Sequence, residues 1–175
     1  MSKKLFKYEV IGFVFTSITG TVAHFLYELS GCNTVVGLFC PVNESVWEHL
    51  KLLFFPYMLY AVFEYFMLKK PKGFFFSKLN GIITGMLTTV AIYYIYNGAV
   101  GKSPDLLNIV SFFIGVAAAY FVSYTLIKNE KEASKTGEII SVILIIALGA
   151  SFILFTLYPP FIPLFEDPRY AVFGR

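Results

Sequence analysis

Residues 43–68 read NESVWEHLKLLFFPYMLYAVFEYFML, a group of ionisable side chains followed at once by a long apolar run. An α-helix rises 1.5 Å per residue, so about 20 apolar residues cross the ~30 Å hydrocarbon layer of a bilayer. Ser45-Val46-Trp47-Glu48 fits a capping box, in which serine and glutamate satisfy free amides of a first helical turn. The stretch therefore predicts a membrane-spanning helix that begins with charged residues.

The rest of the chain has the same character. Its 175 residues are 57% hydrophobic and 14% charged, with a mean hydropathy of +0.71. A soluble domain is about 25% charged, so this chain has too few charges to cover a surface that faces water. The alternation typical of a β-barrel is absent. Five apolar segments have membrane length: 8–29, 45–68, 79–97, 106–127 and 138–157.

We therefore expect an all-α fold, a polytopic bundle of five transmembrane helices that forms a single domain over residues 1–175. A proline-rich tail, residues 158–175, follows the last helix. Its apolar content predicts that it lies against the bundle, on the side of the charged group, rather than in solvent. The expected location is the cell membrane as a multi-pass protein, with the lipid bilayer as partner and no nucleic acid.

Basic residues predict the orientation, because Lys and Arg gather at the cytoplasmic ends of membrane helices. One set of alternate segment ends carries ten of them, and the opposite set carries four. The ten are Lys3, Lys4, Lys7, Lys69, Lys70, Lys72, Lys78, Lys128, Lys131 and Lys135; the four are Lys51, Lys102, Arg169 and Arg175. The N-terminus is thus expected inside and the C-terminus outside, with residues 43–51 on the extracytoplasmic side.

Small and polar residues recur every four positions along the first segment, which places them on one helix face. They are Gly12, Thr16, Gly20, His24 and Glu28. The first three predict close packing against a neighbouring helix. Packing alone does not explain two ionisable residues at the outer end of this face.

Six ionisable residues at the ends of the first two segments are expected at a similar depth. A charge near the centre of a membrane helix costs ~2.5–3.5 kcal/mol on insertion scales, and less toward the ends. Capping, the helix dipole and local ion pairs explain each residue singly. We predict instead that five of them line one pocket between the first two helices, while Lys51, with Asn43, orients or neutralises the carboxylates. The five are His24, Glu28, Glu44, Glu48 and His49.

Three functions fit such a pocket. In the first, His24, Glu28 and His49 bind a divalent cation such as zinc, and Glu44 and Glu48 act as catalytic groups in a membrane hydrolase. Asn43, Trp47 and Lys51 would then contact a lipid-linked or small polar ligand. In the second, the same residues bind or transport a small molecule or ion. In the third, the chain is a non-catalytic membrane subunit. No HExxH motif, nucleotide loop or serine elbow favours another activity.

Two further groups leave smaller questions open. Glu64 lies near the inner end of the second segment, where pairing with Lys69 or Lys70 is expected. Cys32 and Cys40 fall in the loop after the first segment, where a disulfide and two free thiols are about equally compatible with the spacing.

One run of the sequence reads Pro41-Val42-Asn43-Glu44-Ser45-Val46-Trp47-Glu48-His49-Leu50-Lys51. Together with His24, Glu28 and the tail Pro-Leu-Phe-x-Asp-Pro, it resembles a family of small integral membrane proteins. That family is a domain of unknown function, found chiefly in Gram-positive bacteria. The resemblance covers the whole chain and implies a membrane location, without an activity. In residue types alone the pocket is similar to the alkaline ceramidases, but those use three histidines and this chain has two.

Overall fold

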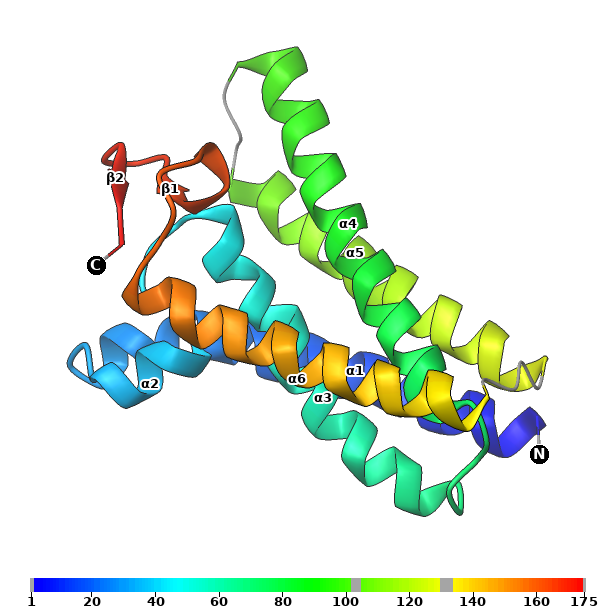
Figure 1. Cartoon of the computed structure of the whole chain (residues 1–175). Helices are drawn as coiled ribbons and strands as arrows, with labels where there is room; N and C mark the ends of the chain where they lie inside the picture. Colours follow the sequence, from blue (N-terminus) through cyan, green and yellow to red (C-terminus); the bar gives the residue numbers. More distant parts are fainter. Residues whose placement is uncertain (1, 102–104, 130–133, 175) are drawn as a thin grey trace.

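A computed structural model describes residues 2–101, 105–129 and 134–174. These residues are almost entirely helical (Figure 1). The helices are α1 (Ser2–Leu29), α2 (Thr34–Phe39), α3 (Val46–Met67), α4 (Phe74–Val100), α5 (Asp105–Lys128) and α6 (Lys135–Leu157). The tail adds a 3-10 turn, η1 (Pro163–Phe165), and two short antiparallel strands, β1 (Glu166–Asp167) and β2 (Val172–Phe173).

The all-α class and the five apolar helices are confirmed. The five long helices are each long and apolar enough to cross a membrane, and the short α2 lies in the connection between α1 and α3. The third apolar helix begins at Phe74, earlier than the predicted 79, because Gly73 adopts a left-handed conformation that turns the chain into α4. The chain is thus a polytopic membrane protein by the length and composition of its helices.

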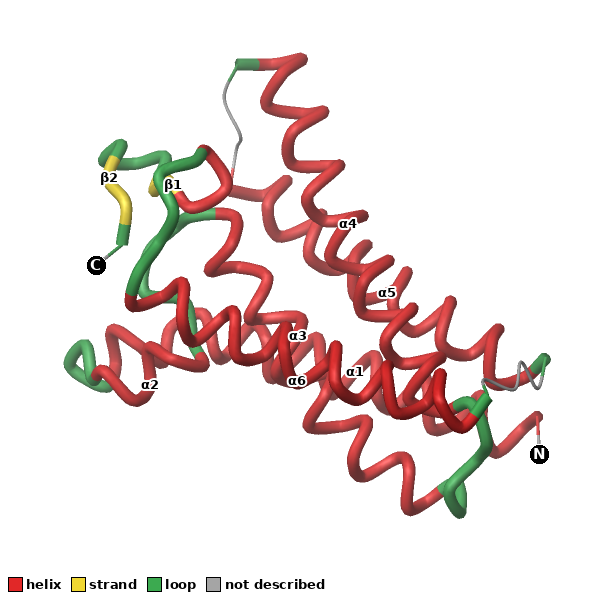
Figure 2. The backbone as a smooth tube through the Cα atoms, in the orientation of Figure 1, coloured by secondary structure: helices red, strands yellow, loops and turns green. Residues whose placement is uncertain are grey.

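The helices pack in an antiparallel bundle. Helices α4 and α5 run side by side. In the view of Figure 1, α6 crosses in front of α3 and of α1. Figure 2 shows the short loop that joins α3 to α4 and the longer connection, with α2 in it, that joins α1 to α3. Helix α1 ends, α3 begins and the tail packs at one end of the bundle, which we call the tail end. We call the opposite end the N-terminal end. The core between them is built on Leu53, Tyr57, Ile82, Val116 and Phe152.

The small residues of α1 form its packing face, as predicted. A Cβ atom placed on Gly12 would lie 2.5 Å from rings of Tyr60 and Tyr120, and one on Gly20 would lie 2.5 Å from the Leu52 carbonyl oxygen. Thr16 is fully buried, and its hydroxyl bonds that of Tyr120 at 2.8 Å. Glycine at these positions therefore lets α1 approach α3 and α5 closely.

The tail lies against the bundle, which confirms that prediction. The Phe165 ring stacks on the Trp47 ring with centroids 4.9 Å apart. The Glu44 amide donates to Asp167 Oδ2 at 3.1 Å, and Asn43 Nδ2 donates to the Gly174 carbonyl at 2.8 Å. The tail thus fixes the segment that precedes α3.

The predicted pairing of Glu64 with Lys69 or Lys70 is wrong. Glu64 Oε2 lies 2.6 Å from Lys78 Nζ, and both side chains are fully buried. The early start of α4 brings Lys78 inside the bundle, beside the last turns of α3. Both cysteines are free thiols, with Cys32 exposed and Cys40 buried.

Orientation across the membrane remains a prediction. Lys102, Lys131 and Arg175, three of the basic residues on which it depends, lie outside the described residues.

Candidate functional site

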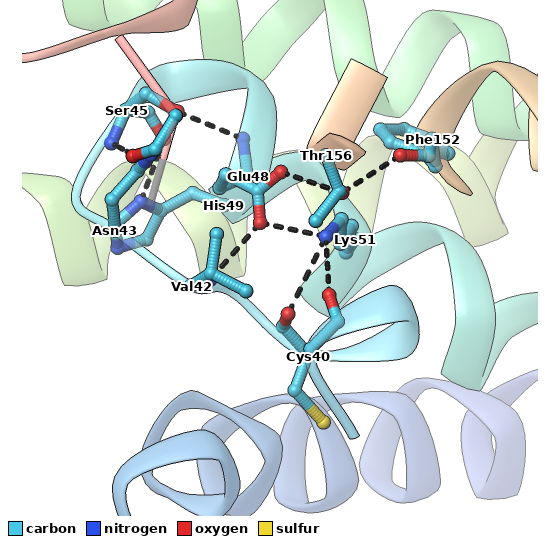
Figure 3. A network of polar contacts seen from close by, with 11 residues as sticks. Cys40, Val42, Asn43, Ser45, Glu48, His49, Lys51, Phe152 and Thr156 are labelled. Carbon is cyan, nitrogen blue, oxygen red and sulfur yellow. Dashed lines mark hydrogen bonds and ion pairs between the residues drawn. The ribbon is translucent and has the colours of Figure 1, made fainter. Parts of the chain in front are cut away.

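The predicted residues fall into two groups rather than one. Glu48 and Lys51 form the first, a buried ion pair with Lys51 Nζ 2.6 Å from Glu48 Oε2. Only 3% of Glu48 and none of Lys51 is exposed. Glu48 Oε2 also accepts from the Val42 amide at 3.0 Å, and Glu48 Oε1 accepts from the Thr156 hydroxyl at 2.9 Å (Figure 3).

Lys51 is equally committed to backbone groups. Its ammonium donates to the Gly37 carbonyl at 2.9 Å and to the Cys40 carbonyl at 3.4 Å. The pair therefore ties α3 to the end of α2 on one side, and to Thr156 of α6 on the other. Both carboxylate oxygens and the ammonium already have partners, so this pair is suited to hold the loop rather than to bind a ligand.

His49 belongs to the second group and lies apart from Lys51 in Figure 3. Its Nδ1 lies 3.0 Å from the Ser45 carbonyl oxygen. A carbonyl can only accept, so Nδ1 carries the proton in this bond, and in neutral imidazole Nε2 is then left with a lone pair. That Nε2 lies 3.4 Å from Glu44 Oε2. Two acceptors face each other here unless a proton or a cation lies between them.

His24 of α1 completes this group. One ligand atom each from His24, Glu44 and His49 lies within 4.8 Å of the others, and all three residues are partly buried. The two imidazole rings have centroids 5.2 Å apart. His24 Nδ1 is buried without a hydrogen-bond partner in the described part of the chain. Two imidazoles and a carboxylate are typical ligands of zinc.

The other predicted residues lie outside this group. Glu28 is exposed, one turn beyond His24 at the end of α1. Asn43 uses its amide to hold the tail, and its Oδ1 accepts from the Ser45 amide at 2.9 Å. Trp47 packs among aromatic rings, with the Phe152 centroid 4.6 Å away. Of the eight predicted site residues, the structure brings together His24, Glu44 and His49.

A cavity of about 510 Å³ adjoins the group, and Glu44 and His49 form part of its wall. It lies between α3, α4, α5 and the tail. The remaining wall is mixed, because apolar residues of α3 face hydroxyl and amide side chains of α4 and α5. These polar residues are Thr89, Tyr93, Asn97, Asn108 and Ser111.

Arg169 of the tail also lines this cavity, although its position in the sequence hardly predicts this. Its Nη2 lies 3.3 Å from Glu44 Oε1, and its side chain is 54% exposed. Glu44 is therefore held between a cation on one oxygen and His49 on the other. The only signal in the sequence is that the tail combines apolar residues with a late arginine.

Residues 1–174 match a protein family, DUF6512, which is described as a family of unknown function. No curated protein and no solved structure matches the chain. The chemistry of the site must therefore be argued from its geometry.

Proposed function

We propose that this chain, which belongs to the DUF6512 family, is a cell-membrane protein that binds one divalent cation, such as zinc, through His24, Glu44 and His49. The observation that carries the proposal is the approach of His49 Nε2 to Glu44 Oε2 at 3.4 Å, while Nδ1 is bonded to the Ser45 carbonyl. A histidine that ligates a metal almost always donates its other ring N–H in this way.

A proton on His49 would also relieve the contact between these two acceptors. The third residue favours a metal ion over a proton, because an ion can also use a nitrogen of His24 as a ligand. Bonds of about 2.0–2.2 Å to zinc place neighbouring tetrahedral ligands about 3.4 Å apart. The His49–Glu44 distance already has this value. His24 would close on the ion, since the three ligand atoms now span up to 4.8 Å.

A set of two histidines and one glutamate leaves a coordination position for water, as in zinc hydrolases. A bound cation lowers the pKa of such a water to about 7 and so supplies a nucleophile. We infer that the substrate class is a lipid-linked or envelope molecule whose polar part enters the cavity beside Glu44 and His49. Glu48 does not fit the role of general base that its sequence suggests, because its oxygens already accept from three donors. In the predicted orientation this chemistry takes place on the extracytoplasmic side.

The proposal is tested on purified protein by zinc titration and elemental analysis. We expect one zinc per chain, and a loss of affinity on the order of 100-fold in His24→Ala, His49→Ala and Glu44→Gln. Glu28→Gln is the matched control, because it removes a carboxylate one turn from His24, outside the group. Equal zinc binding in the control and in the three variants would contradict the proposal, as would an absence of stoichiometric zinc.

The alternatives from the sequence predict other outcomes of the same experiments. Uptake of an ion or solute by protein without zinc, lost in Glu44→Gln, would support transport. A protein whose binding and activity are unchanged in all three variants would be a structural subunit. Release of a polar head group from envelope lipids by zinc-loaded protein, but not after chelation, would support the hydrolase.

A further inference from the structure

Three charged side chains meet inside the bundle, toward the N-terminal end. Lys78 Nζ of α4 lies 2.6 Å from Glu64 Oε2 of α3 and 3.1 Å from Glu9 Oε1 of α1. Glu64 and Lys78 are fully buried, and Glu9 is 3% exposed. We call these three residues the triad. They lie at the opposite ends of α1 and α3 from His24, Glu44 and His49.

The surroundings of the triad keep the ammonium charged, and none of the residues that the structure describes adds a second cation there. The rings of Tyr57, Phe74 and Tyr120 have centroids 5.2–5.3 Å from Lys78 Nζ, a geometry that stabilises a cation. Ser123 of α5 donates to Glu9 Oε1 at 2.9 Å. Tyr60 donates to the Tyr8 carbonyl. At this end of α6, Glu138 is an acid that accepts from the Phe75 amide at 3.2 Å.

Two carboxylates therefore share one ammonium inside the bundle, where almost nothing of either side chain is exposed. If both were ionised, the triad would carry one uncompensated negative charge. An unpaired buried charge costs several kcal/mol, and in practice the group takes up a proton instead. Two carboxyl groups held close to each other titrate as a coupled pair, in which one keeps its proton longer.

We propose that the triad is a proton-binding site that holds one exchangeable proton, with Glu9 as the residue that carries it. Glu64 has the shorter contact with Lys78 and so remains the ionised partner. Glu9 Oε2 is buried, and no donor among the described residues bonds it; the same holds for Glu64 Oε1, so the longer distance to Lys78 is what favours Glu9. A proton on this oxygen removes the excess charge without breaking the bond from Ser123 to Oε1.

Access also differs between the two carboxyl groups. Glu9 lines a cleft of about 300 Å³ between α1 and α5, which is otherwise apolar and aromatic, with Phe6, Phe13 and Phe121 in its wall. Glu64 does not line this cleft. An apolar reagent that dissolves in the membrane and enters this cleft would therefore lie beside Glu9 and not beside Glu64.

Dicyclohexylcarbodiimide tests this inference, because it modifies protonated carboxyl groups in apolar surroundings. The acid O–H adds across a C=N bond of the reagent, and the adduct rearranges to a stable N-acylurea that retains every atom of both molecules. We expect mass spectrometry of the detergent-solubilised full chain to find the adduct on Glu9. Its yield should fall as the pH is raised and the proton is lost, and Glu9→Gln should abolish it.

Two variants should change the labelling of Glu9 in opposite directions. Glu64→Gln removes the excess negative charge, so Glu9 should ionise against Lys78 and its labelling should fall at least tenfold. Lys78→Met removes the cation, so labelling of Glu9 should persist to higher pH. Size-exclusion chromatography checks that each variant is folded, and Glu64→Gln suffices if Lys78→Met does not fold. Unlabelled Glu9 in the unmodified chain at every pH, or labelling unchanged in Glu64→Gln, would overturn the inference. Neither result bears on the zinc site.

Discussion

Two pairs of charged or ionisable residues lie at the start of α3, yet they have different surroundings. One pair is Glu48 with Lys51, and the other is His49 with Glu44. The first pair is buried, and its polar atoms are bonded to α2, α6 and the loop at Val42. The second pair is partly exposed, borders a cavity and leaves His49 Nε2 facing a carboxylate oxygen. Residue type therefore does not separate a structural ion pair from a ligand site. What separates them is how many of their lone pairs and protons are already used.

The helix geometry explains why neighbours in sequence divide in this way. Positions three apart share a face of a helix, whereas adjacent positions are about 100° apart. Glu48 and Lys51 therefore point together toward α2 and α6. His49 points to a different side, where His24 of α1 and the cavity lie.

Breaking the structural pair should have the largest effect. Lys51→Met leaves Glu48 buried without its cation, which typically costs 3–5 kcal/mol of the free energy of unfolding. Thermal unfolding in detergent, followed by tryptophan fluorescence, should show a large fall in Tm or a loss of folded protein. The double variant Glu48→Gln with Lys51→Met should recover part of the loss. Glu44→Gln, in the partly exposed group, should cost about 1 kcal/mol or less. Similar losses for Lys51→Met and Glu44→Gln would erase the distinction between the two groups.

The two cysteines report on the same contrast between closed and open regions. Cys32 is exposed, whereas Cys40 is 7% exposed beside Lys51. Burial raises the pKa of the Cys40 thiol, and the nearby charge of Lys51 opposes this only in part. Fewer thiolates form at Cys40 near neutral pH, so maleimide should label Cys32 more than tenfold faster. Labelling of a Cys32→Ser variant should be slow at pH 7 and rise in alkaline buffer. Fast labelling of Cys40 at pH 7 would show that the region around the Glu48–Lys51 pair is open.

The smallest effect should come from replacing Arg169, which contacts the partly exposed group of His24, Glu44 and His49. Its guanidinium lies 3.3 Å from Glu44 Oε1 and competes with a metal ion for this carboxylate. Arg169→Gln should therefore tighten zinc binding a few-fold, because a nearby positive charge is removed. An exposed ion pair of this kind contributes ~0–1 kcal/mol, so the Tm should hardly change. Isothermal titration gives the affinity, and weaker zinc binding in Arg169→Gln would instead assign the arginine a supporting role.

Much of the fold follows from the sequence because apolar length directly predicts helices that cross a membrane. The small-residue face of α1 was equally readable, since Gly12, Thr16 and Gly20 recur at helical spacing. Glu64 was assigned the wrong partner because the nearest lysines in sequence are not the nearest in space. Gly73 starts α4 early enough to bury Lys78 against it.

The candidate site was predictable in composition but not in grouping. His24, Glu44 and His49 were all identified by type and position. Their separation from Glu48 and Lys51 depends on which helix lies beside each face of α3. Contacts to the tail matter as well, and Asn43 bonds Gly174, 131 positions away. No local pattern encodes contacts over such a distance.

The contacts of the tail also bear on the order in which the molecule can be made. Asp167, Arg169 and Gly174 hold Glu44 and Asn43 in place, yet a ribosome synthesises them after helices α1 to α6. Chains fold from the N-terminus as they are synthesised, so the bundle can insert and pack before these residues exist. A chain released early would thus resemble the finished protein in its membrane helices and lack the completed wall around Glu44. Residues translated after α6 therefore complete the surroundings of Asn43 and Glu44, which are made much earlier.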